Sequence, residues 1–421
     1  MRVLTTNCAL RGRSGSEIVT IDLASGLQQR GHEVAVFAPL LGPSAELLRL
    51  RGITVTDRLE DVPWTPDVIH GHHNHVLASA LAHFRDSPGL FVCHSATYWF
   101  DGPPRLPRVK RICAVDEACR ARVVAETGCP SDEIALLTNA VDTELFGPRG
   151  PLPAQPARAL LLAKNTAHVA AVREAARQSG LALDEIGTAF GREVDDLHVQ
   201  LRTYDLVFAT ARMALEAMAV GCAVVVVDGR GLAGLATTAT VDEWRNRNFG
   251  VSLLTRPLSA EGIAAEIAGY DAADATRVSQ RIRAVATLPA YLDRVEALHR
   301  EVAGARHLVD PAEDLRATGI FMAQWLRRLG EGTIPENFDT LLAANKFAAE
   351  HRVVVDENAA LREQRTALQR DLDGSAARVA AMEVELARIR RKGTLAEILR
   401  SPLAALRDQT AAWRQRLFSR K

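Results

Sequence analysis

The sequence has no excess of charge of either sign. Its 421 residues include 51 lysines and arginines against 51 aspartates and glutamates. A net charge of zero gives no argument for a nucleic-acid partner. The sequence also lacks an apolar run of about 20 residues, so we expect no membrane-spanning helix. The opening stretch MRVLTTNCAL carries one basic residue before a short strand-like run, and we expect no signal peptide.

Cysteine is scarce, and no two cysteines form a CxxC pair. The six cysteines are scattered in or beside apolar runs, which favours reduced thiols over disulfides. Reduced thiols make the expected localisation cytoplasmic. An apolar content of 48% with 24% charged residues is typical of a soluble globular protein. The length favours two domains with further segments.

Short β-like runs alternate with helical patterns over residues 1–147. MRVLTT, EVAVFAP and GLFVCHS are strand-like, whereas SEIVTIDLASGLQQRG has a helical pattern. Such alternation predicts a mostly parallel sheet with helices on both faces, where ligands bind at the carboxyl ends of the strands. A proline-rich stretch at 148–159 is typical of a linker. The alternation resumes over 160–288, so the cleft between the two α/β domains is the expected binding site.

From residue 289 onward the pattern is helical throughout. Residues 289–350 are predicted to form helices that can cross back to the first domain. Over 351–392, mostly apolar residues recur at the a and d positions of a heptad, with Asn358 and Arg365 as polar a positions that would cost stability but fix the register. This pattern favours a parallel homodimeric coiled coil over a lone solvated helix. Residues 393–421 form a basic amphipathic tail that either lies on the inner face of a membrane or packs on the protein itself.

The segment FATARMALEAMAVG, residues 208–221, carries a carboxylate in an otherwise apolar, small-residue helix between two predicted strands. A helix that begins just after a strand of a parallel sheet points its first amides toward the ligand edge of that sheet. Thr210 and Arg212 are therefore placed where a pyrophosphate would bind. Glu216 is placed to accept hydrogen bonds from a ribose diol. The alternative is that Glu216 only favours the helix N-terminus electrostatically.

Histidines gather at the ends of two predicted strands. His70, His72, His73 and His75 are dense enough to suggest a metal site, because imidazole is a common metal ligand. No matching carboxylate or cysteine stands at metal spacing nearby, so we favour sugar contacts or structural hydrogen bonds and expect no metal. His94 ends the run GLFVCH and is expected to point into the cleft. A satisfied core histidine is the alternative.

Several strings resemble, in the same order, motifs of retaining GT-B glycosyltransferases of family 4 (glycosyl transferases group 1). ALEAMAVGCAVVVVDGRG resembles the donor-binding run that closes their E-x7-E motif, and SGSEIVTIDLASGLQQRGHEV their first loop and helix. DVIHGHH and LFVCHS resemble two of their strands, and ALLTNAVDTELFGP a further motif. The resemblance covers about 1–302. It implies two Rossmann-like doubly wound domains, an acceptor domain followed by a nucleotide-sugar domain, here with an all-helical C-terminal extension.

The resemblance also implies an activity. It predicts a hexosyltransferase-like enzyme of polysaccharide biosynthesis that moves a sugar from a nucleotide-sugar to a glycan or lipid-linked acceptor with retention, without a further cofactor. Phe208 stands where the first glutamate of E-x7-E is expected, and the loop that contacts the donor sugar is cut out. Two other functions therefore stay open: a non-catalytic scaffold in surface-polysaccharide assembly, and a nucleotide-sugar epimerase.

The site residues follow from the same motifs. His94 matches the family histidine near the reaction centre, and Glu216 matches the second glutamate of E-x7-E, which holds the ribose. Lys164 and Arg192 are the candidates for neutralising the leaving diphosphate, with Arg212 able to replace the missing loop. The predicted nucleotide-sugar-binding residues are Gly15, Glu17, Asn139, Lys164, Arg192, Thr210, Arg212 and Glu216.

Overall fold

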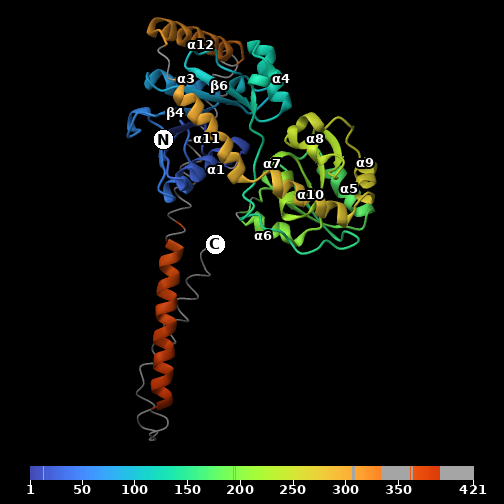
Figure 1. Ribbon diagram of the computed structural model, residues 1–421. Helices are drawn as coiled ribbons and strands as arrows, with labels where there is room; N and C mark the ends of the chain where they lie inside the picture. The colour runs from blue at the N-terminus through green and yellow to red at the C-terminus, as the bar shows by residue number, and fades with distance from the viewer. Residues whose placement is uncertain are drawn as a thin grey trace. The chain divides into compact units, whose positions relative to one another are not determined.

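The computed structural model describes residues 1–12, 14–192, 194, 196–305, 309–332, 361 and 364–388. The chain divides into two compact units, Met1–Leu326 and Arg327–Lys421. The first unit contains two separate sheets, each covered by helices (Figure 1). Most of the buried hydrophobic residues of this unit pack on the faces of these two sheets.

The N-terminal sheet has seven strands in the order β3-β2-β1-β4-β5-β6-β7, and every neighbouring pair is parallel. Its central strands are almost entirely buried, as expected for a parallel sheet with helices on both faces. The strands are β1 Arg2–Thr6, β2 Glu33–Phe37, β3 Thr54–Thr56, β4 Val68–His72, β5 Gly89–Cys93, β6 Val109–Ala114 and β7 Ala135–Leu136.

Four helices from the first part of the chain pack on this sheet, and a fifth returns to it from beyond the second sheet. The first four are α1 Gly15–Gln29, α2 Pro43–Leu50, α3 Asn74–His83 and α4 Glu117–Thr127. The returning helix is α11, Leu288–Gly304, which lies against α1 (Figure 1). Leu292, Val295 and Val302 of α11 belong to the same core cluster as Leu4 of β1. Short 3-10 turns occur at η1 Leu59–Asp61, η2 Trp99–Asp101 and η3 Ser131–Glu133.

The second sheet has the order β12-β11-β10-β8-β9, and only β12 runs antiparallel to its neighbour. Its strands are β8 Arg158–Leu162, β9 Ala182–Ile186, β10 Leu206–Ala209, β11 Ala223–Asp228 and β12 Gly231–Leu235. Its helices are α5 Val169–Gln178, α6 Leu197–Gln200, α7 Ala211–Val220, α8 Val241–Asn246, α9 Ala260–Ala268 and α10 Ala272–Val285, with 3-10 turns η4 Thr188–Phe190, η5 Leu201–Thr203 and η6 Val251–Leu253. The predicted fold class, two doubly wound α/β domains with a helical extension, is confirmed.

The segment 208–221 folds as the sequence predicts, into the end of a strand followed at once by a helix. Phe208 lies in β10 and is fully buried, in the same core cluster as Leu161 and Val225. Thr210 alone separates β10 from α7. The position of the expected first glutamate therefore lies inside the strand, and no loop is present there to carry a sugar contact.

The helical extension begins with α12, Pro311–Gly332, and continues in the second unit. Residues 364–388 are helical there, with exposed side chains at Leu368, Leu372 and Val379. The rest of the predicted coiled coil and the basic tail at 393–421 lie outside the described residues. None of the helices that the structure describes has the length and apolarity needed to span a bilayer.

Candidate functional site

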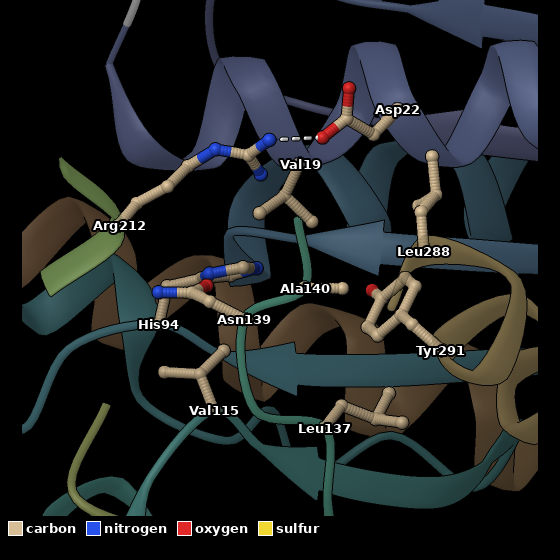
Figure 2. Close-up of a pocket in the computed structure, with 10 residues that line it drawn as sticks. All are labelled: Val19, Asp22, His94, Val115, Leu137, Asn139, Ala140, Arg212, Leu288 and Tyr291. Atoms are coloured by element: carbon tan, nitrogen blue, oxygen red, sulfur yellow. Dashed lines mark hydrogen bonds and ion pairs between the residues drawn. The ribbon is translucent and has the colours of Figure 1, made fainter. Parts of the chain in front are cut away.

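A small pocket opens between the two sheets of the first unit (Figure 2). It encloses about 10 Å³, room for roughly one water molecule. Its walls come from α1, from the segments that follow β5, β6 and β7, from the start of α7, and from α11. The lining residues are Val19, Asp22, His94, Val115, Leu137, Asn139, Ala140, Arg212, Leu288 and Tyr291.

Arg212 is the cation of this pocket, and it is held between two carboxylates. Its Nε–H donates to Oε1 of Glu216, one helical turn further along α7, over 2.8 Å. Its Nη2 pairs with Oδ2 of Asp22 on α1, 190 positions earlier in the chain (Figure 2). Burial alone would lower the pKa of Arg212, but the charges of Asp22 and Glu216 raise it above its ordinary value. The guanidinium is therefore a fixed positive charge at the pocket.

The N-terminus of α7 reaches the same region. Thr210 is the residue before the first turn, and its side chain makes no capping hydrogen bond. Ala211 has φ +51°, in the left-handed region that alanine rarely adopts, and its N–H donates to the carbonyl of Phe249 over 2.7 Å. The helix start is thus fixed to the loop after α8 through a strained residue, a feature that often accompanies a binding site.

His94 follows β5 and lines the pocket as part of a network of buried histidines. Its Nε2 lies 2.5 Å from Nδ1 of His72, at the end of β4. Behind them, Nδ1 of His70 lies 2.8 Å from Nε2 of His299 on α11. Burial lowers the pKa of His94 to about 4, and burial with mutual repulsion holds the pKa values of His70 and His72 well below their usual range. At neutral pH His94 is therefore an uncharged hydrogen-bonding group.

The other two histidines of the predicted cluster, His73 and His75, bond to the backbone and pack against an aromatic ring near the network. Nδ1 of His73 accepts the backbone N–H of Cys8 over 3.2 Å, and the ring of His75 packs on Trp325 of α12 with centroids 4.9 Å apart. Among the residues that the structure describes, no group of three histidine, cysteine or carboxylate side chains has metal-binding geometry.

Asn139 lines the pocket and is held in place by a second asparagine. Its backbone N–H donates to Oδ1 of Asn248 over 2.8 Å, and Nδ2 of Asn248 donates to the carbonyl of Val115. Asn248 follows α8 in the second sheet's layer, whereas Val115 follows β6 of the first sheet. One buried side chain therefore connects the two sheets beside the pocket, and its left-handed φ of +51° suits an asparagine.

Gly15 and Glu17 lie at the start of α1, outside the pocket lining. Gly15 is the first residue of the helix and has open space around its Cα. The Glu17 carboxylate accepts the backbone N–H groups of Arg11, Gly12 and Ser14 over 2.6 to 2.8 Å. Burial opposes its ionisation, but these amides hold the pKa of Glu17 below its ordinary value. In this conformation Glu17 shapes the loop after β1.

Lys164 and Arg192 come together at the carboxyl ends of β8 and β9, again outside the pocket lining. The Thr188 hydroxyl donates to the carbonyl of Lys164, and Gly187 N–H donates to the carbonyl of Arg192 over 2.7 Å. Both cationic side chains are exposed at this edge of the second sheet. The structure thus gathers His94, Asn139, Arg212 and Glu216 at one place, and Lys164 with Arg192 at another.

Asp22, Asn248 and Tyr291 contribute to the site although the sequence analysis did not select them. Asp22 had a usable pattern, because it is a lone carboxylate in the apolar run IVTIDLASGL, just as Glu216 is in its own helix. Tyr291 stands on the returning helix α11, and burial raises its pKa above the ordinary value. No local pattern marks Asn248 or Tyr291, since only the tertiary fold brings Asn248 to its partners Asn139 and Val115 and Tyr291 to the pocket.

The sequence and the fold are both similar to those of known glycosyltransferases. Residues 13–145 match the model of glycosyltransferase family 4. HepE of Anabaena in complex with UDP-glucose superposes with a TM-score of 0.55 at 15% identity, covering 72% of this chain and 100% of that one. This chain has the GT-B fold of glycosyltransferases.

Other solved structures agree with the GT-B fold. HepE in complex with UDP gives a TM-score of 0.54 at 14% identity, covering 72% of this chain and 100% of that one. A glycosyltransferase from Rickettsia africae gives 0.50 at 12% identity, covering 72% and 98%. No curated protein matches the sequence. The pocket therefore lies between the two Rossmann-like domains of a GT-B fold.

Proposed function

We propose that the protein is a glycosyltransferase that moves a sugar from a nucleotide-sugar to a glycan or lipid-linked acceptor with retention of configuration. The observation that carries this proposal is the convergence of a buried cation, a neutral histidine and a buried carboxylate at one GT-B interdomain pocket. The similar HepE structures hold UDP and UDP-glucose, which makes UDP-sugars the first donors to test.

Each residue of the site has a separate proposed role in the transfer of the sugar. Cleavage of the bond to the sugar leaves negative charge on the diphosphate, and Arg212 supplies a preorganised positive charge there. Lys164 and Arg192 lie outside the pocket, and their part in neutralising the diphosphate is proposed from the sequence motifs alone. Glu216 accepts hydrogen bonds from the ribose. His94 donates or accepts a hydrogen bond without carrying charge, and the leaving phosphate serves as base toward the acceptor.

Nucleotide binding and its dependence on Glu216 test this proposal. We expect UDP to raise the thermal midpoint of the wild type, because a ligand that binds only the native state stabilises it. Glu216→Ala should weaken UDP binding by at least about 10-fold, the effect of losing a hydrogen bond to a charged group. The matched control is Glu261→Ala, which removes an exposed carboxylate from α9 of the same domain. The absence of any stabilisation by UDP or other nucleoside diphosphates would refute the proposal.

A non-catalytic scaffold in surface-polysaccharide assembly is the second candidate. It is favoured by the single residue, Thr210, that connects β10 to α7 and leaves no room for a sugar-contacting loop. A scaffold would bind UDP without transferring or hydrolysing UDP-glucose. Turnover of a UDP-sugar by the wild type, lost in Arg212→Gln, would decide for the enzyme.

We also propose that the C-terminal extension pairs two copies of the chain. In the described helix, Leu368 at position d and Leu372 and Val379 at position a are exposed in the single chain, and Ser375 occupies the d position between the last two. In a parallel pair, a residue at position g faces position e of the next heptad in the second copy. Arg378 at g then faces Glu383 at e, which favours parallel pairing in register.

The tail at 393–421 lies outside the described residues, and its proposed role rests on sequence alone. Its arginines and its apolar positions suit contact with an anionic membrane surface, where a lipid-linked acceptor would be found. Co-sedimentation with anionic and neutral vesicles, before and after deletion of the tail, tests this contact.

A further inference from the structure

The Arg212 guanidinium makes its two carboxylate contacts through different nitrogens. Nε bonds to Glu216 within α7, whereas Nη2 bonds to Asp22 on α1 of the other domain. These bonds use two of the five N–H donors of the group. An anion can therefore replace Asp22 on Nη2 while Glu216 keeps its bond to Nε and continues to hold the side chain at the pocket.

The side chains around Arg212 carry a net negative charge. Asp22, Arg212 and Glu216 together carry a formal charge of −1, and the side chains of Arg212 and Glu216 are about 90% buried. Among the residues that line the pocket, Asp22 and Arg212 carry the formal charges, since burial keeps His94 neutral. A diphosphate brought to Arg212 therefore meets the Asp22 carboxylate at close range, in surroundings where water screens charge poorly.

We propose that Asp22 competes with the diphosphate of the nucleotide for Arg212 and so sets how tightly the site holds phosphate. Asp22 occupies Nη2 in the structure, and under this proposal it yields that nitrogen to the diphosphate of the nucleotide. The same carboxylate then weakens retention of the nucleoside diphosphate product. This inference rests on the proposed function, because it assumes that a nucleotide binds at Arg212. The pocket there has room for about one water molecule, so the two domains must separate further to admit the nucleotide.

A purely structural role for Asp22 makes a different prediction. If Asp22 only joins α1 to α7 or orients Arg212, its loss should weaken the binding of phosphate. If Asp22 competes for Arg212, its loss should strengthen that binding. Uridine, which lacks phosphate, separates the two effects from any general change in the site.

The test is the ratio of uridine to UDP dissociation constants, measured by calorimetry on the full chain. Asp22→Asn keeps the size of the side chain and an acceptor oxygen but removes the charge. We expect it to tighten UDP binding by about 10-fold, the scale of a close charge pair, and to leave uridine binding unchanged. The matched control, Asp86→Asn, neutralises an exposed aspartate of the same domain and should change neither constant.

A second variant ties the effect to Arg212. In Arg212→Gln, the preference for UDP over uridine should fall, and adding Asp22→Asn to it should tighten UDP binding clearly less than the same change does in the wild type. Thermal midpoints without ligand establish that each variant is folded. An unchanged or lower UDP preference in Asp22→Asn would overturn the competition. If the wild type bound neither UDP nor uridine, the proposed function would fail instead.

Discussion

The neutral imidazoles of His72 and His94 form a hydrogen bond with each other beside the pocket. His72 Nδ1 and His94 Nε2 are 2.5 Å apart, so one nitrogen carries the hydrogen and the other accepts it. His72 is fully buried, and removing one partner would leave a polar nitrogen of the other without its hydrogen bond. An unpaired buried group costs about 1–3 kcal/mol, whereas replacing both partners by apolar groups can be nearly neutral.

A double-mutant cycle on this pair should therefore show coupling. We expect His72→Leu and His94→Leu each to lower the free energy of unfolding by about 1–3 kcal/mol, and the double variant to lose clearly less than their sum. Urea denaturation provides the four values. His72→Asn, which places a polar atom near the former Nδ1, should recover part of the loss. Strict additivity of the two single changes would show that the contact contributes nothing.

At this scale the sequence selected residues that the fold brings together, but it did not give their partners. His94, Asn139, Arg212 and Glu216 were all selected from sequence, and they meet at one place. The partner of Arg212 could not be found that way, because Asp22 lies 190 positions away and only the tertiary fold brings the two side chains together.

At the scale of elements, periodicity predicted the helices and strands around the site. The run 208–221 forms the strand and helix expected of it because its apolar residues fill both sheet faces. The antiparallel β12 had no comparable pattern. Gly231 has φ +153°, and a Cβ there would lie 2.7 Å from the carbonyl of Leu254, so this strand depends on tertiary contact and on the absence of a side chain.

The proposed coiled coil gives a test at this scale. We expect the full chain to have about twice its 45.7 kDa mass by light scattering. Leu368→Asp with Leu372→Asp should give the single-chain mass, because charges would enter the apolar seam. Ala377→Asp, on the outer face of the same helix, is the control and should keep the double mass.

The pair Arg378–Glu383 tests whether the two helices of the coiled coil run parallel and in register. Arg378→Glu should weaken dimerisation by placing like charges opposite each other, and adding Glu383→Arg should restore it. A single-chain mass for the wild type would contradict the pairing altogether. Failure of the reversed pair to rescue would contradict the parallel register alone.

For the first unit as a whole, the buried histidines dominate the dependence of stability on pH. Burial lowers the pKa of His73 and His299 to about 3 and that of His75 and His94 to about 4. The unfolded chain binds these protons near pH 6.5, whereas the native fold excludes them. Stability is therefore complete above pH 6.5 and falls as the pH drops below it, by up to about 1.4 kcal/mol per pH unit for each histidine.

The carboxyl group of Asp101 has the opposite effect on the dependence of stability on pH. Burial raises the pKa of Asp101 to about 7, against the effect of Arg122, so between pH 4 and 7 the native state holds a proton that the unfolded state releases. Acidification therefore stabilises the fold through Asp101, but a single carboxyl cannot offset several histidines. The expected net result is a loss of several kcal/mol between pH 6.5 and 5, measured by urea denaturation at each pH.

Variants and salt can separate these contributions. Asp101→Asn should make the pH dependence steeper, because it removes a group that opposes the buried histidines. Added salt should have little effect, since the shifts arise mainly from burial and salt screens mainly exposed charges. Unchanged stability between pH 6.5 and 5 would mean that the histidine network accepts protons without opening. His94 could then carry a positive charge beside the pocket, and the neutral role proposed for it would be wrong.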